Sequence, residues 1–323
     1  SPEYIVGTDV TPPENSEFLS CYSHEIEEWS HFNQLSMGWT AASDSESGIG
    51  GYSWCTSISS DTIPDAVPDS PVYPRHILTP PVSDGQEWYF HVRAVDKAGN
   101  AAPEALHMGP FWIDATPPEP PVITPTDDYS TGTWYNDEII LNFDRGEDNL
   151  SGSHRIRFNF TKRSDSIPVR GEETWDTSWV HGGSLNNGDN WYCHAQTRDR
   201  AGNYSEPSHC GAFWIDGSAP RGDLLVESIP DSDNFNVTAR AEDPLSGIKW
   251  WHIYYREIGE SEYTDYEYRV TENPTLFTPP DPTKGYELAV RFVDNADNWS
   301  SYRGPYPARN GEHLRGIVQE EMD

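Results

Sequence analysis

Aspartate and asparagine residues recur at fixed spacing, and they are the side chains best suited to bind an ion. The sequence Asp-x-x-Ser-Gly stands at positions 44–48, 148–152 and 243–247. A second sequence, Asp-x-Ala followed by Gly or Asp and then Asn, stands at 96–100, 199–203 and 294–298. Ca²⁺ binds carboxylate and amide oxygens in proteins. Each pair of motifs therefore predicts a Ca²⁺ site, provided that the fold brings its two loops together.

The linker after each of the first two repeats offers one further carboxylate. Asp114 stands in Phe111-Trp-Ile-Asp-Ala-Thr-Pro-Pro118, and Asp216 stands in the equivalent segment of the second repeat. The expected ligand sets are Asp44, Asp96, Asn100 and Asp114, then Asp148, Asp199, Asn203 and Asp216, and finally Asp243, Asp294 and Asn298. Asp, Asn and Gly are also the residues that tight turns require without a metal. The sequence leaves both interpretations open.

The spacing of the motifs predicts whole domains. The first motif recurs after 104 and then 95 residues, and the second after 103 and then 95. A period near a hundred residues corresponds to a domain rather than to one turn of a solenoid. The predicted units are an N-terminal strand or tail at 1–8, domains at 9–113, 114–215 and 216–309, and a C-terminal tail at 310–323. Because the linker sequence also occurs at 9–13, we expect residues 1–8 to be the last strand of a preceding domain.

The elements that must position these loops are β-strands. Apolar residues alternate at Trp88, Phe90, Val92 and Ala94, which is the pattern of a strand with one buried face. Pro and Gly clusters separate such runs at short intervals, and no convincing helical period occurs. The sequence therefore predicts an all-β chain of three tandem antiparallel β-sandwich domains in an elongated array.

The segments 88–100 and 109–118 resemble the immunoglobulin-like and fibronectin type III-like repeats of large bacterial and archaeal extracellular proteins. The resemblance covers nearly all of the chain. The second repeat departs from the pattern at Cys193 and Cys210, and the third has Asp297 where Gly is usual. The resemblance implies an architecture and a location outside the cell, and it leaves the strand order and the activity open.

The charge of the chain excludes one class of partner. The sequence has 21 basic and 53 acidic residues, a net charge of -32, which repels nucleic acid and anionic membranes. Only four residues are Lys, so the composition fits an ordinary acidic secreted protein and also one adapted to high salt. No apolar run approaches the ~20 residues that a membrane-spanning helix needs.

The four cysteines predict an oxidising, extracellular compartment, with disulfides Cys21–Cys55 and Cys193–Cys210 inside separate domains. Histidines adjoin the second pair, at His194 and His209. Because adjacent residues on a strand point to opposite faces, each Cys-His pair cannot converge on one zinc ion.

The segment 249–256 is rich in aromatic residues. Alternation places Trp251, Ile253 and Tyr255 on one face, which we expect to be core. The opposite face carries a candidate surface for a sugar ring or a neighbouring subunit, unless it is itself covered. Its residues are Trp250, His252 and Tyr254.

Motifs of catalysis are absent from the sequence: it has no Gly-x-Ser-x-Gly, no His-Glu-x-x-His and no phosphate-binding loop. We therefore predict a non-enzymatic structural protein of the cell surface, part of a stalk, sheath, surface layer or filament, stiffened by Ca²⁺ and joined by strand addition through 1–8 or 310–323. Its expected partners are further copies or other surface proteins. The alternative is an adhesin or carbohydrate-binding accessory array that binds glycans.

Overall fold

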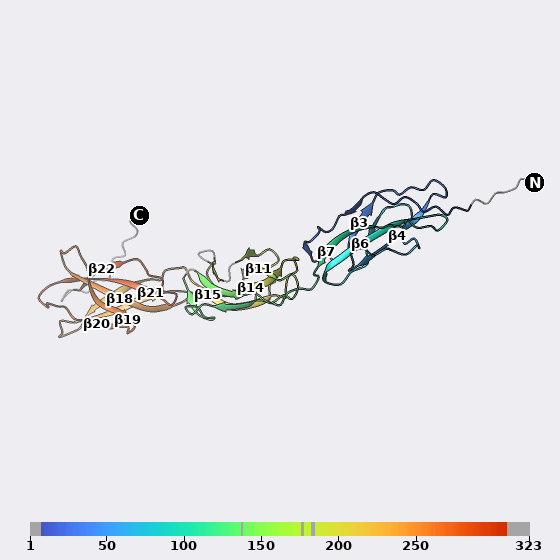
Figure 1. Cartoon of the computed structure of the whole chain (residues 1–323). Coiled ribbons are helices and arrows are strands. Elements are labelled where there is room, and N and C mark those ends of the chain that lie inside the picture. The colour runs from blue at the N-terminus through green and yellow to red at the C-terminus, as the bar shows by residue number, and fades with distance from the viewer. Residues whose placement is uncertain (1–7, 137, 176–177, 182–184, 309–323) are drawn as a thin grey trace, which may run out of the picture.

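Three β-sandwiches follow one another end to end in the computed structural model (Figure 1). It describes residues 8–136, 138–175, 178–181 and 185–308. These residues form strands, turns and loops and contain no helix. The prediction of an all-β chain of tandem antiparallel sandwiches is confirmed. The N-terminal and C-terminal segments proposed for strand addition lie outside the described residues, apart from residue 8.

The first domain packs a three-stranded sheet, in the order β1-β3-β5, against a four-stranded sheet, in the order β2-β7-β6-β4. The strands are β1 (Leu19–Cys21), β2 (Trp29–Ser30), β3 (Ser36–Trp39), β4 (Ile49–Ser57), β5 (His76–Leu78), β6 (Gly85–Asp96) and β7 (Leu106–Ile113). The central strands β4, β6 and β7 pair antiparallel, whereas the short edge strand β2 pairs parallel with β7.

The second domain repeats this arrangement with sheets β13-β10-β8 and β12-β11-β14-β15-β9. Its strands are β8 (Val122–Pro125), β9 (Trp134–Tyr135), β10 (Ile139–Asp144), β11 (Ser153–Thr161), β12 (Glu172–Thr174), β13 (Ser178–His181), β14 (Gly188–Asp199) and β15 (Ser208–Ile215). The parallel edge pairing recurs between β9 and β15. The strands β11, β14 and β15 of this domain thus correspond to β4, β6 and β7 of the first.

The third domain has sheets β16-β17-β20 and β19-β18-β21-β22. Its strands are β16 (Arg221–Ser228), β17 (Phe235–Glu242), β18 (Ile248–Glu257), β19 (Thr264–Val270), β20 (Thr275–Phe277), β21 (Tyr286–Asp294) and β22 (Arg303–Ala308). The fourth strand, β19, joins the sheet of β18 and β21, whereas a constant-type immunoglobulin domain adds its fourth strand to the other sheet. The strand order of the third domain therefore differs from that of a constant-type immunoglobulin domain.

Each domain has its own hydrophobic core between its two sheets. In β6 the alternating residues Phe90, Val92 and Ala94 are fully buried, as the sequence pattern predicted. In β18 the residues Trp251 and Ile253 belong to the core of the third domain, together with Phe292 of β21. The three cores draw their residues from successive segments of the chain. Every domain can therefore bury its apolar faces without its neighbours.

The chain leaves each of the first two domains along the parallel edge strand. The backbone N–H of Asp114 donates to the carbonyl of Ser30 at 3.0 Å, and that of Asp216 donates to the carbonyl of Tyr135 at 2.9 Å. Ser30 and Tyr135 end the edge strands β2 and β9. The first residue of each linker is therefore an extension of the sheet that precedes it.

The two expected disulfides are not formed, since all four cysteines are free thiols. Cys21 packs against the core of the first domain, whereas Cys55 is the register partner of His91 on the opposite sheet. The prediction of a Cys21–Cys55 bridge is wrong, because Cys55 lies on the face that points away from the core. Cys193 and Cys210 are direct cross-strand partners and both face the core of the second domain.

Oxidation of the protein should join Cys193 to Cys210 and leave Cys21 and Cys55 as thiols. Directly opposed residues of an antiparallel pair have Cα atoms about 4.5–5.5 Å apart, inside the range that disulfides span. Peptide mapping by mass spectrometry without reduction identifies the bridge, and Cys210→Ser serves as its control. Recovery of a bridge that contains Cys55 would contradict this placement.

Truncation of one core residue should affect one domain only. Phe158 is 1% exposed and packs on Phe143 with ring centroids 5.5 Å apart. We expect Phe158→Ala to destabilise the second domain by about 3–5 kcal/mol, because it leaves a cavity in a closed core. Hydrogen exchange measured by mass spectrometry should show lost protection only in peptides of the second domain, for example those of β11 and β14. Equal loss of protection in β6 and β21 would show that the three domains unfold as one unit.

Candidate metal centres at the domain junctions

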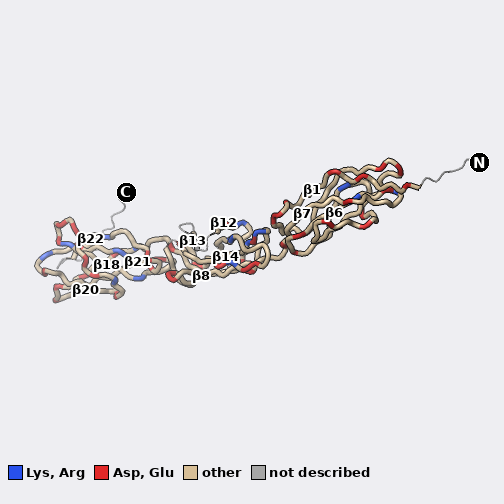
Figure 2. Tube along the Cα trace, in the orientation of Figure 1, with Lys and Arg blue, Asp and Glu red and all other residues tan. Residues whose placement is uncertain are grey.

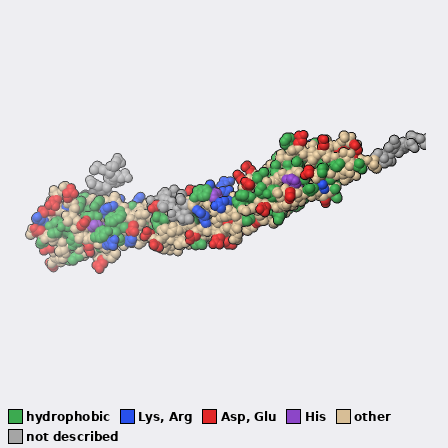
Figure 3. All heavy atoms as spheres, viewed as in Figure 1, with side chains coloured by type: hydrophobic (Ala, Val, Ile, Leu, Met, Phe, Trp, Pro, Cys, Tyr) green, Lys and Arg blue, Asp and Glu red, His purple; other side chains and the backbone are tan. Residues whose placement is uncertain are grey.

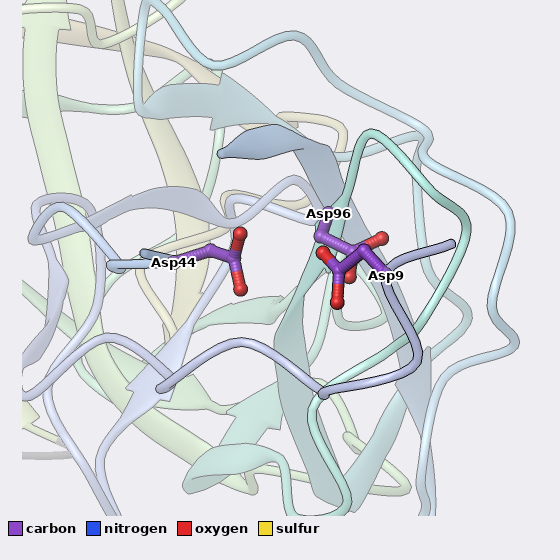
Figure 4. Close-up of side chains that lie close together, drawn as sticks. All are labelled: Asp9, Asp44 and Asp96. Atoms are coloured by element: carbon purple, nitrogen blue, oxygen red, sulfur yellow. The ribbon is translucent and has the colours of Figure 1, made fainter. Parts of the chain in front are cut away.

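Three aspartates converge at the N-terminal end of each domain. The groups are Asp9, Asp44 and Asp96, then Asp114, Asp148 and Asp199, and finally Asp216, Asp243 and Asp294. Within a group, one carboxylate oxygen from each residue lies within 4.8 Å of the others. Figure 4 shows the first group, in which Asp44 points across a short gap toward Asp9 and Asp96. We call each group a junction triad.

Each junction triad takes its members from three equivalent places. One aspartate comes from the linker, one from the Asp-x-x-Ser-Gly loop, and one from the last residue of β6, β14 or β21. The loop aspartate shapes its own turn, since Asp243 Oδ1 accepts the N–H groups of Ser246 and Gly247 at 2.8 and 3.1 Å. That turn uses one carboxylate oxygen, which leaves the other for the triad. Formation of the turn therefore does not by itself exclude ion binding by the same side chain.

The linker aspartates belong to the domain that follows them, which corrects the sets expected from the sequence. Asp114 was expected beside Asp44 and Asp96, but its carboxylate accepts the N–H of Ser151 at 3.0 Å and joins the second triad. Asp216 likewise moves to the third triad. The backbone of each residue continues the preceding sheet, so its side chain projects beyond that domain into the next.

Asp9 completes the first triad and was not among the expected ligands. Its carboxylate accepts the N–H of Ser47 at 3.1 Å, the same bond that Asp114 makes with Ser151. The signal was present in the sequence, because Asp9 opens a segment with the composition of the two later linkers. An alignment of the three linkers by position would have found it.

The asparagines tie the linker to the domain and turn their amide nitrogens toward the triads. Asn203 Nδ2 donates to the carbonyl of Asp114 at 2.8 Å and to Asp199 Oδ2 at 2.7 Å. Both partners are acceptors only, so the nitrogen must face them. Asn100 and Asn298 make the same two bonds in their domains. The expected role of these asparagines as oxygen ligands does not match this orientation.

The triads collect negative charge, and no Lys or Arg of the described residues forms an ion pair with them. Asp114, Asp199, Asp216 and Asp294 are fully buried. Burial raises the pKa of Asp199, and the charge of Asp114 adds to that shift; burial and Asp216 act on the pKa of Asp294 in the same way. Three carboxylates so placed suit a hard divalent cation such as Ca²⁺, with further oxygens from backbone or water.

The aromatic face of β18 is covered, so the expected surface of Trp250, His252 and Tyr254 is not available to a partner. These side chains are 8%, 6% and 7% exposed. A second layer of rings lies over them, because Trp299 meets Trp250 at 4.9 Å and Tyr302 meets Tyr254 at 4.9 Å between ring centroids. Figure 3 shows hydrophobic and basic side chains together on this part of the third domain.

A hollow in the third domain offers little for acid–base chemistry. Its lining includes Phe235, Ile258 and Pro279, and its one ionisable side chain is Lys284. General acid–base catalysis needs a positioned acid or base of suitable pKa beside the reacting group.

Within the described residues, no helix is long and apolar enough to cross a membrane.

Comparison with known proteins adds little to this geometry. No family model matches the chain, and no curated protein matches it. Among solved structures, the FN1–FN3 domains of chicken CNTN1 match at 13% identity over 93% of this chain and 99% of that chain, with a TM-score of 0.33. At that TM-score the match carries no information about function.

Replacement of a triad carboxylate should stabilise the second domain when Ca²⁺ is removed. Asp148→Asn keeps the oxygen that accepts the N–H of Gly152 and replaces a like charge beside Asp199 with a donor. Relief of one repulsion at this separation is worth between about 1 and 4 kcal/mol. We expect higher stability than wild type in chelator and no further gain on adding Ca²⁺, measured by urea unfolding. The exposed Asp128→Asn is the matched control.

The same variant should depend on pH in a defined direction. A raised pKa means that the folded state binds a proton more tightly than the unfolded state, so protonation of Asp199 stabilises the domain as pH falls. The advantage of Asp148→Asn in chelator should therefore shrink as pH falls through the raised pKa of Asp199. A variant less stable than wild type in chelator would mean that Asp148 serves only its turn.

Proposed function

We propose that this chain is a non-enzymatic structural segment of a protein displayed outside the cell, in a stalk, sheath, surface layer or filament. Its domains are of the kind found in tandem repeats of bacterial and archaeal extracellular proteins. Their role is to supply length and stiffness. Ca²⁺ bound at the junction triads is the stiffening ion.

One observation carries this proposal: the linker after each of the first two domains contributes a buried aspartate that meets two aspartates of the following domain. Asp114 is bound through its N–H to Ser30 of the first domain and through its carboxylate to Ser151 of the second. A cation held by Asp114, Asp148 and Asp199 would fix the direction in which the second domain leaves the first. Because Asp216 is bound in the same way, the second junction obeys the same geometry.

An extracellular location fits the chemistry of such sites. Extracellular Ca²⁺ modules bind the ion with dissociation constants of about 10⁻⁴–10⁻³ M, which suits the calcium levels found outside cells. Acidic residues are distributed over all three domains (Figure 2), so the array repels nucleic acid and anionic lipid. The expected partners are further copies of the chain or other surface proteins, with glycans as the partner in the adhesive alternative.

Removal of Ca²⁺ should make the array bend more freely. Small-angle X-ray scattering of the full chain should show a larger maximum dimension and a narrower distance distribution with Ca²⁺ than with chelator. We expect Asp148→Asn combined with Asp243→Asn to resemble the chelated wild type in both conditions, because one carboxylate is lost from each of the two described junctions. Asp128→Asn with Glu272→Gln removes the same charge from exposed positions and should behave as wild type.

Scattering that is identical in Ca²⁺ and chelator would overturn the stiffening role. Electron microscopy of the native material addresses the structural role separately. Filaments or lattices would support a structural array, whereas dispersed single molecules that bind immobilised glycans would favour the adhesive alternative.

A further inference from the structure

A second kind of site occurs on the outer face of the first domain. His91 of β6 and His107 of β7 are register partners, and their Nδ1 atoms lie 2.7 Å apart. His91 is fully buried, although its neighbours Phe90 and Val92 point into the core and it therefore points outward. His107 is exposed and covers it. Histidine side chains reach the surface of this domain in Figure 3.

The second domain repeats the pair with the same geometry. His194 of β14 and His209 of β15 are register partners, and their Nδ1 atoms are again 2.7 Å apart. The inner ring is again fully buried and the outer one exposed. The third domain has Ala289 at the position of the inner histidine. Two of the three repeats therefore carry the pair.

The second nitrogen of each inner ring contacts a hydroxyl group. His91 Nε2 lies 2.9 Å from Ser57 Oγ, and His194 Nε2 lies 2.8 Å from Thr161 Oγ1. Each hydroxyl also contacts a backbone carbonyl and a second hydroxyl, so it can accept the proton of the ring. In the tautomer with Nε2–H, the lone pair of Nδ1 faces the partner ring. Metal-binding histidines are oriented by this kind of bond to their other nitrogen.

A chain of contacts links each inner histidine to a carboxylate four residues after its hydroxyl partner. Ser57 joins His91 to the carbonyl of Ser59, whose hydroxyl donates to Asp61 at 2.7 Å. Thr161 joins His194 to the carbonyl of Arg163, whose side chain pairs with Asp165 at 3.2 Å. Asp61 and Asp165 are exposed on loops, so their side chains can turn toward the imidazoles.

We propose that each histidine pair binds a divalent transition-metal ion such as Zn²⁺ through its two Nδ1 atoms, with Asp61 or Asp165 as a third ligand. Imidazole nitrogen suits Zn²⁺, Cu²⁺ and Ni²⁺, whereas carboxylate-only sites suit Ca²⁺. In a tetrahedral zinc site with Zn–N of about 2.0–2.1 Å, two ligand nitrogens lie roughly 3.3 Å apart. The pair must open slightly, and the exposed outer ring is free to do so.

This site is separate from the junction triads and from the cysteines. The histidines lie on the outer face of the sheet, whereas Cys193 and Cys210 lie on its core face, so a site of two Cys and two His remains excluded. The bound ion would clamp β6 to β7 and β14 to β15. It would act within a domain, whereas Ca²⁺ at a triad acts between domains.

Calorimetric titration of the full chain with ZnCl₂ tests this assignment, at neutral pH and with excess CaCl₂ to fill the triads. We expect two equivalents of Zn²⁺ per chain. His107→Ala and His209→Ala should each remove one equivalent, and the double variant should remove both. Both residues are exposed, so their replacement leaves the cores intact. The exposed His76→Ala is the matched control and should keep both equivalents.

Asp61→Asn should weaken binding at the first site at least about tenfold while that site still fills, and Asp165→Asn should do so at the second. Unchanged affinity in these variants would overturn the assignment of the carboxylates. Absence of Zn²⁺ binding by the wild type, or binding that survives the double histidine variant, would overturn the proposal. If the wild type binds no Zn²⁺, the two Nδ1 atoms of each pair only share a proton.

Discussion

A single residue at each junction is bonded to two domains at once. The N–H of Asp114 completes the edge of the first domain, while its carboxylate and its carbonyl accept bonds from Ser151 and Asn203 of the second. The backbone and the side chain of Asp114 are both held by hydrogen bonds to ordered residues. The junction therefore lacks the conformational freedom of a flexible linker. The alignment of the array, the placement of the triads and the proposed action of Ca²⁺ all depend on this double attachment.

The same arrangement imposes an electrostatic conflict. A linker aspartate that enters the next domain meets the loop aspartate and the strand-end aspartate, and at least two of the three carboxylates in the second and third triads are fully buried. Backbone and amide N–H groups stabilise the charges only in part, since burial still raises the pKa of Asp199 and Asp294. A cation or a proton resolves the conflict, which makes occupancy of the triad sensitive to conditions outside the protein.

Periodic patterns predicted the fold well and the contacts between segments less well. Alternation found the buried residues of β6 and β18, and repeated loops located two members of every triad. Asp114 was assigned to the ligand set of the wrong domain, because its position depends on the direction in which the chain leaves β7. The prediction of a Cys21–Cys55 bridge was wrong because the sequence does not show that Cys55 lies on the outer face of β4. The histidine pairs were overlooked because their partners come from different strands, although equivalent histidines stand in both repeats.

The double attachment also defines how the array carries mechanical load. Tension along the chain crosses each junction through the backbone of one aspartate, whose side chain is anchored in the downstream domain. The domains cannot be drawn apart without withdrawing that carboxylate from its triad. Ca²⁺ bound as proposed would add its binding free energy to the work needed to separate two domains, so a change in external calcium would alter the mechanical strength of each junction.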